Sequence, residues 1–181
     1  MKKLATICSL AFLLVVGIAF NAAAIPISGA ISFDGDYTVN APLGAATEFT
    51  SFTDVEVGSG GGIGDYSALI ENTPLTMYTF AFAPFSAPVP DWWTVEVGGI
   101  TYSFDITSLS IPLQINNALV LEGNGIASIT GMDDTPGTWT LTANASGSTF
   151  TFSGGVAVPE PLTLILLGSG LIGIIAIRRK L

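Results

Sequence analysis

Residues 25–157 are predicted to form an all-β domain, an antiparallel β-sandwich of jelly-roll type. Three observations predict this fold class. Gly, Ser and Thr are abundant and strong helix formers are scarce, a composition that favours strands and turns. Apolar and polar residues alternate with a period of two along several segments, as in half-buried strands. Gly98 and Gly99 separate two such segments, and a two-residue glycine loop is typical of a tight hairpin.

A domain of this length can bury one core and is too short for two. The expected strands are, in order, 27–33, 48–57, 76–83, 94–97, 100–106, 119–121, 126–130, 138–142 and 149–152. A flexible loop is expected over 58–64. A type II turn is expected at Pro136 and Gly137, because proline presets φ and glycine tolerates a positive φ. The pattern predicts no amphipathic helix in this domain.

The chain begins with the three parts of a secretory signal. Two lysines supply the charged start, and an apolar stretch follows over 4–20. Ala22 and Ala24 then supply the small residues at positions −3 and −1 of a cleavage site. We therefore predict a signal peptide over 1–24 that signal peptidase removes after Ala24. An uncleaved signal anchor is the alternative.

The end of the chain, residues 158–181, combines a short motif, an apolar run and a basic end. The motif is Pro159, Glu160 and Pro161, and the basic end contains Arg178, Arg179 and Lys180. The uncharged run 162–177 spans roughly 24 Å as a helix, somewhat less than a hydrocarbon core of ~30 Å. We predict that it is a transmembrane helix whose basic end stays cytoplasmic. The domain then lies outside the inner membrane.

This triple arrangement resembles the PEP-CTERM protein-sorting signal, a bacterial tail handled by membrane-embedded exosortases. The family often places Ser-Thr or Ala-Thr after Pro-Glu-Pro, where this chain has Leu162 and Thr163. The resemblance implies an exported protein that the tail holds in the inner membrane and that is cut near 159–161. The domain would then pass to the cell surface or to the extracellular polymer of a biofilm. A permanently anchored protein is the alternative. The two prolines also keep the backbone extended, as a processing enzyme requires.

Charges are strongly segregated along the chain. All five Lys and Arg residues lie at the termini, and thirteen of the fourteen acidic residues lie between Asp34 and Asp134. The domain therefore carries a side-chain charge of about −13 without internal counter-charge, which repels phosphate backbones and excludes nucleic acid as a partner. The only cysteine, Cys8, lies in the predicted signal, so no disulfide is expected in the domain.

The residue types of the domain also limit its chemistry. It contains no His, Cys, Lys or Arg, which excludes histidine- and cysteine-based nucleophiles, lysine Schiff bases and metal sites with nitrogen or sulfur ligands. We predict a protein that is not an enzyme and has no required cofactor. A pair of carboxylates acting as a glycosidase is an alternative, although no pair stands out in the sequence.

Two binding functions are alternatives to a passive surface or matrix protein. The closest acidic clusters are Asp34 with Asp36 and Asp133 with Asp134. Their oxygen atoms are the ligands that Ca²⁺ prefers. Trp92 and Trp93 are adjacent, and adjacent residues of a strand point to opposite faces. We expect one of them in the core and the other on the surface, where it can stack on a sugar of an extracellular polysaccharide. The domain would then be a carbohydrate-binding or Ca²⁺-dependent adhesive module.

Overall fold

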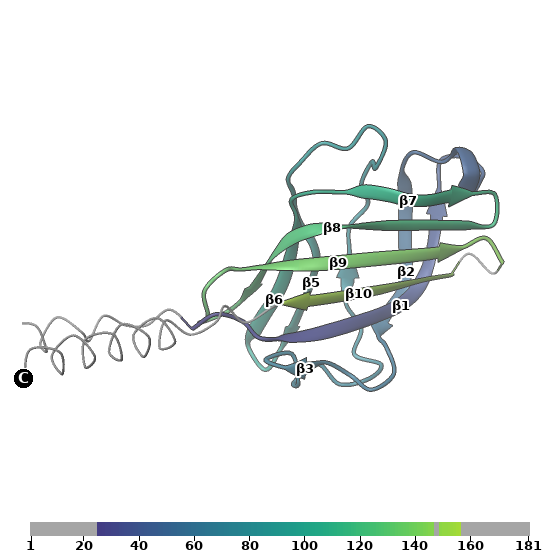
Figure 1. Ribbon diagram of the computed structural model, residues 1–181. Coiled ribbons are helices and arrows are strands. Elements are labelled where there is room, and N and C mark those ends of the chain that lie inside the picture. Colours follow the sequence, from purple (N-terminus) through teal and green to yellow (C-terminus); the bar gives the residue numbers. More distant parts are fainter. Residues whose placement is uncertain (1–24, 147–148, 157–181) are drawn as a thin grey trace, which may run out of the picture.

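The computed structural model of the chain describes residues 25–146 and 149–156. These residues fold as an all-β, antiparallel domain that is nearly barrel-shaped (Figure 1). Its strands are β1 (Gly29–Val39), β2 (Phe49–Val57), β3 (Ile63–Gly64), β4 (Thr76–Met77), β5 (Val89–Val97), β6 (Ile100–Ile106), β7 (Ser110–Ile115), β8 (Ala118–Ile129), β9 (Thr135–Asn144) and β10 (Thr149–Val156). A short 3-10 helix, η1 (Leu43–Ala45), follows β1.

The described residues contain no helix with the length and apolar character needed to span a bilayer. The predicted signal peptide over 1–24, the predicted transmembrane helix over 162–177 and the basic end lie outside the described residues.

The strands join in one sheet in the order β2-β1-β10-β9-β8-β6-β5-β4, with β3 added to β1 and β7 added to β8. The two ends of this order also meet. The Leu75 N–H donates to the Val55 carbonyl at 3.1 Å, and the Phe49 N–H donates to the Phe80 carbonyl at 3.1 Å. These bonds connect β2 to the segment around β4, so the sheet curls back on itself around one core (Figure 1).

The prediction of an all-β antiparallel domain is confirmed. The described strands form one curled sheet. The finer prediction of a sandwich of jelly-roll type stays a prediction. The hairpin between β5 and β6 is confirmed, since Val97 pairs with Ile100. Gly98 and Gly99 form its loop, with φ of 62° and 80°.

The predicted type II turn at Pro136 and Gly137 is wrong, because both residues lie inside β9. Glycine is needed at 137 for a different reason. A Cβ there would lie 2.9 Å from the Gly155 carbonyl oxygen of β10, closer than real Cβ atoms approach. The turn lies earlier in the chain, at Gly131, whose φ is 87°.

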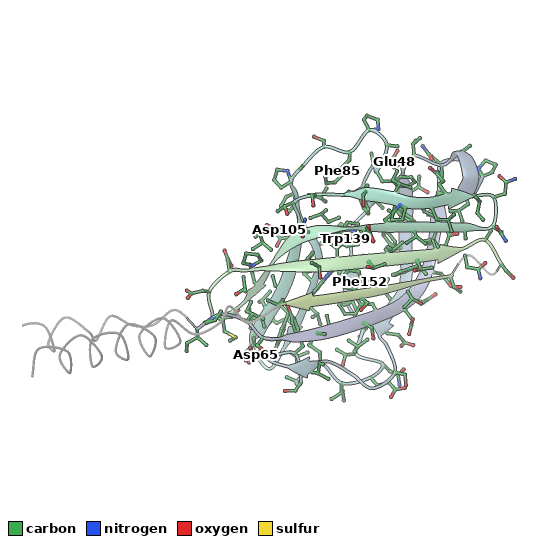
Figure 2. All side chains as sticks on the ribbon, viewed as in Figure 1. Glu48, Asp65, Phe85, Asp105, Trp139 and Phe152 are labelled. Atoms are coloured by element: carbon green, nitrogen blue, oxygen red, sulfur yellow. The ribbon has the colours of Figure 1, made fainter. Side chains whose placement is uncertain are left out.

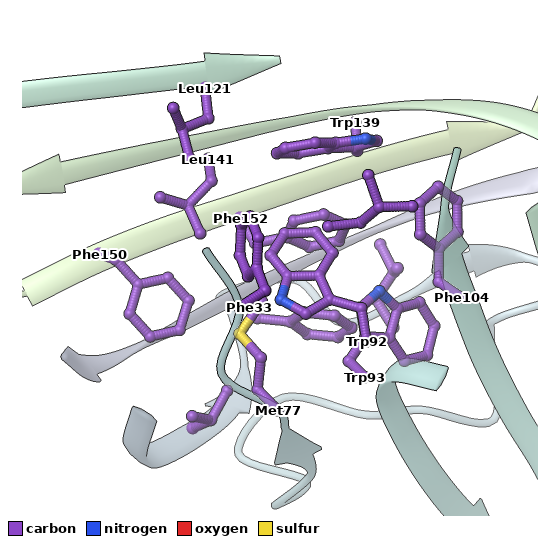
Figure 3. Packing of buried hydrophobic residues seen from close by; sticks show 14 of the residues in the cluster. Phe33, Met77, Trp92, Trp93, Phe104, Leu121, Trp139, Leu141, Phe150 and Phe152 are labelled. Atoms are coloured by element: carbon purple, nitrogen blue, oxygen red, sulfur yellow. The ribbon is translucent and has the colours of Figure 1, made fainter. Parts of the chain in front are cut away.

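The core is a cluster of aromatic rings inside the curled sheet (Figure 3). Its largest fully buried side chains are Trp92, Trp93, Trp139, Tyr66, Phe33, Phe49, Phe82, Phe104, Phe152, Ile27, Leu69 and Ile106. The ring of Phe152 stacks on Phe33 at 5.0 Å between centroids and meets Trp92 edge-on at 5.4 Å. Figure 2 shows Trp139 on β9 and Phe152 on the adjacent β10. Burial of each such ring contributes about 1.5–3 kcal/mol to folding.

Candidate functional site

Both ends of the described domain lie at one end of the sheet, which we call the terminal pole (Figure 1). The terminal pole comprises residues 25–29, 131–137 and 154–156. Val156, the last residue of β10, pairs with Gly29 on one side and Gly137 on the other. The Asp133 N–H donates to the Ile25 carbonyl at 3.2 Å. The residues that follow the predicted signal peptide therefore lie beside those that precede the predicted sorting tail.

A buried hydrogen bond ties the N-terminal segment to the terminal pole. The Ile27 N–H donates to Thr135 Oγ1 at 2.9 Å, and the Thr135 hydroxyl donates to the Asp133 carbonyl at 2.8 Å. The Ile27 side chain is fully buried. An unpaired buried N–H would cost roughly 1–3 kcal/mol, so this bond holds the start of the domain in place.

The end of β10 is held differently, because it contributes few side chains. Gly154 and Gly155 precede Val156, and their partners on the neighbouring strands include Ala30 and Trp139. A Cβ at Gly155 would meet only the Ala30 Cβ, at 4.0 Å. Glycine in a strand weakens the strand, since it has no side chain to pack. Backbone hydrogen bonds therefore contribute most of the pairing of this strand end.

The sorting motif, the basic end and the signal-cleavage residues lie outside the described residues. These residues are Pro159, Glu160, Pro161, Arg178, Arg179, Lys180, Ala22 and Ala24. The sequence still limits how far the motif lies from the sheet. Two residues separate Val156 from Pro159, and three peptide steps span at most about 11 Å. The motif therefore begins close to the terminal pole.

Trp92 and Trp93 are both buried in the core, with 0% and 1% of their surface exposed (Figure 3). The prediction that one of them lies on the surface and stacks on a sugar is wrong. The β5–β6 pairing shifts register between Val89 and Trp93, and Asp91 has a φ of 46°. Such a bulge breaks the alternation of the strand, so both indoles point into the core. Their role in the described structure is packing.

Asp34 and Asp36 lie on β1, where they line a surface hollow of about 270 Å³ together with Asp54 and Glu56 of β2. Asp34 pairs with Glu56 across the two strands. The Thr151 hydroxyl donates to Asp34 Oδ1 at 3.1 Å. The structure therefore places the first predicted pair of Ca²⁺ ligands beside two further carboxylates in one hollow.

Asp133 and Asp134, the second predicted pair of Ca²⁺ ligands, lie apart from this hollow at the terminal pole. Asp134 Oδ1 accepts a hydrogen bond from the Ser128 hydroxyl at 2.6 Å. Within residues 25–146 and 149–156, no three acidic side chains are arranged so that they could hold one metal ion. The four predicted ligands are therefore not brought together.

Sequence reasoning missed a polar surface on the outside of β1, β10 and β9, which we call the hydroxyl face. Its residues are Ser32, Thr138, Thr140, Thr142, Thr151 and Ser153. Cross-strand pairing aligns them in rows, since Ser32 pairs with Ser153 and Ser153 pairs with Thr140. The face continues into a hollow of about 370 Å³ that includes Glu122 and Asn124 of β8. The threonines that alternate with apolar residues in 138–142 were the available signal.

Two tyrosines of the domain have perturbed acidity. Burial, and after it the charge of Asp65 and the phenol of Tyr102, raise the pKa of Tyr66. Burial also raises the pKa of Tyr37. Both phenols therefore stay protonated at neutral pH, where they act as packing groups rather than as acids or bases.

Comparison with known proteins identifies the end of the chain. Residues 157–180 match the family model of the PEP-CTERM protein-sorting motif. The match confirms the predicted sorting tail and indicates exosortase-dependent sorting of an exported protein. No curated protein and no solved structure matches the chain.

Proposed function

We propose that this is a protein of the bacterial cell surface or extracellular matrix that is sorted through its tail, and that it is non-catalytic, because its domain has no His, Cys, Lys or Arg. The observation that carries the proposed sorting is the match over 157–180, directly after the last strand of a folded domain. In this scheme the tail holds the precursor in the inner membrane until an exosortase cuts near 159–161. One peptide bond breaks: the acyl group on the domain side passes to a hydroxyl, thiol or water nucleophile, and the amine left on the tail takes up the proton that this nucleophile loses.

The terminal pole supports this scheme. The residues after the predicted signal cleavage and those before the tail lie side by side at this pole. The domain can therefore fold outside the membrane while either chain end is still attached to it. The side-chain charge of the domain, about −13, also supports this scheme, since it repels the anionic headgroups of the membrane surface.

The test is to express the full chain in cells with and without an active exosortase and to measure the mass of the mature C-terminus. We expect a domain that ends near 157–161 only in cells with the enzyme. The substitution of Glu160 by Gln in the motif should reduce this product, whereas the same type of change at Glu96, an exposed residue of β5, should not. An intact tail in both kinds of cell would contradict the proposal.

The hydroxyl face favours a second function, which is binding of a neutral extracellular polysaccharide. Aligned hydroxyl, amide and carboxylate groups can exchange hydrogen bonds with a polyhydroxylated chain. The domain has no Lys or Arg to attract an acidic polymer, and its own charge repels one. A neutral glycan is therefore the better match.

Binding of the purified domain to a panel of neutral and acidic glycans tests this second function. We expect Thr140→Val and Thr142→Val to weaken binding to a neutral glycan, because each change removes a hydroxyl from the face. Thr101→Val on β6, which lies outside the hydroxyl face, serves as the matched control. Equal binding by all variants, or binding to acidic glycans alone, would contradict the assignment.

A further inference from the structure

The end of β10 lies directly upstream of the sorting motif, and this inference about it rests on the proposed cutting of the tail. We propose that Gly154, Gly155 and Val156 detach from the sheet before the tail is cut, and that the stability of their pairing sets the rate of cutting. The detached residues then form the upstream part of the extended segment that the processing enzyme takes up.

The sorting motif follows β10 after a very short length of chain. The motif begins at most about 11 Å after Val156, and Val156 is paired on both sides, with Gly29 and Gly137. An enzyme that holds the chain on both sides of a bond near 159–161 needs upstream residues as well. Those residues belong to the described strand β10 or follow it immediately.

The sheet and the processing enzyme compete for the same backbone groups. Main-chain N–H and C=O groups give an extended peptide its affinity for a partner. In residues 154–156 these groups face the neighbouring strands β1 and β9. Each N–H donates one hydrogen bond, so a donor that is paired in the sheet is not free for the enzyme. The strand end must therefore leave the sheet before the enzyme can hold it.

The sequence of the strand end keeps the free-energy cost of detachment low. Gly154 and Gly155 have no side chains to expose, so only the Val156 side chain leaves a buried position. Strand ends of this kind open with small free energies. Opening stops at Phe152, whose fully buried ring stacks on Phe33 at 5.0 Å. The detachable segment is therefore limited to the residues after this ring.

The neighbouring strands remain in place when β10 opens. The Ile27 N–H keeps its buried bond to Thr135 Oγ1 at 2.9 Å, and Ile25 keeps its bond from Asp133. The start of β1 and the start of β9 are thus tied to each other without the end of β10. Detachment is a local opening and does not require the domain to unfold.

A substitution in the opening segment, upstream of the motif, tests this. Gly155→Ala, for which there is room, reduces the backbone freedom of the open strand end and so disfavours opening by about two- to fivefold. Cutting tracks the open population when opening is fast, so pulse-chase of the full chain in cells with exosortase should show cutting about two- to fivefold slower.

The control for overall stability is Ala118→Gly, a half-buried position at the other end of the sheet, where Ala118 pairs with Ile115 and Asn144. It should leave the rate unchanged. A flexible Gly-Ser spacer inserted after Val156 moves the motif away from the sheet, so it should speed cutting and abolish the effect of Gly155→Ala.

Each result decides between the alternatives. Equal rates for the wild-type chain and Gly155→Ala, or no effect of the spacer, would overturn the detachment of β10 while leaving the proposed function intact. Wild-type chain that keeps its tail in cells with exosortase would overturn the proposed function itself.

Discussion

The three buried tryptophans differ in one respect that stability measurements can test. The Trp139 indole N–H donates to the Asn124 carbonyl at 3.2 Å. The indole N–H groups of Trp92 and Trp93 have no hydrogen-bond partner among the described residues. A typical hydrogen bond contributes about 0.5–1.5 kcal/mol to stability, and a buried unpaired donor costs about 1–3 kcal/mol. All three side chains are almost fully buried, so replacement by Phe removes a similar buried volume at each position.

We therefore expect Trp139→Phe to lower the free energy of unfolding by roughly 1.5–4.5 kcal/mol more than Trp92→Phe does. Trp139→Phe removes a hydrogen bond, which destabilises the domain, whereas Trp92→Phe removes an unpaired buried donor, which stabilises it. Urea unfolding of the purified domain 25–157, followed by circular dichroism, measures both values. Trp93→Phe should resemble Trp92→Phe, with equal m-values throughout. A loss of stability in Trp92→Phe as large as that in Trp139→Phe would refute the reasoning and indicate that water satisfies the Trp92 N–H.

Three further predictions follow from charge and close packing. The pKa of Tyr66 is raised above its ordinary value of 10.0 in the folded state, so the folded domain retains this proton when the unfolded chain has lost it. The free energy of unfolding should therefore fall as pH rises above about 10, and Tyr66→Phe should flatten this fall in alkaline melting curves. Gly137→Ala should destabilise the domain by about 1–3 kcal/mol, because its Cβ would crowd the Gly155 carbonyl; an unchanged melting temperature would contradict this close approach. CaCl₂ and NaCl at equal ionic strength should raise the melting temperature equally, through screening of the carboxylates. A shift with Ca²⁺ alone that EDTA reverses would instead indicate a bound ion.

Strands could be predicted where a local signal coincides with the face that is buried. The predicted strand 100–106 has the same bounds as β6. Its hairpin loop was readable because Gly98 and Gly99 suit the positive φ of a tight turn. Trp139 and Leu141 alternate with exposed threonines, and the structure buries both.

Strand residues were missed where contacts with distant parts of the chain determine which residue type fits. Two short strands were expected over 119–130, but β8 is continuous there. Gly123 and Gly125 interrupt the apolar pattern, yet both are inside the strand because other parts of the chain come close. A Cβ at Gly123 would collide with the Ser108 carbonyl, and one at Gly125 with the Asp105 carbonyl. Sequence spacing alone contains no information about these approaches.

The strand β7 was missed for the opposite reason, since almost all of it is exposed and no face is buried. Pro112 in its middle also argues against a central strand, and β7 does pair only with β8 among the described strands. The error at Trp92 and Trp93, like that at Gly123 and Gly125, comes from contacts with another part of the sheet. The alternation rule holds for a regular strand, and the bulge that breaks it depends on the register with β6.

The tail and the domain differ in how their functions are encoded, and this explains what could be predicted for each. A sorting enzyme reads a short contiguous segment, so the motif at 159–161 was recognisable from its own residues. A surface for a polysaccharide or an ion is assembled from several strands, and its residues meet only through register, as Ser32, Ser153 and Thr140 do. At the terminal pole both the sequence and the structure are needed. The sequence gives the short distance from Val156 to the motif, and the structure shows that Val156 is paired with Gly29 and Gly137. How fast the tail is cut should therefore depend on how Gly155 and Val156 are paired in the sheet, and not on the motif alone.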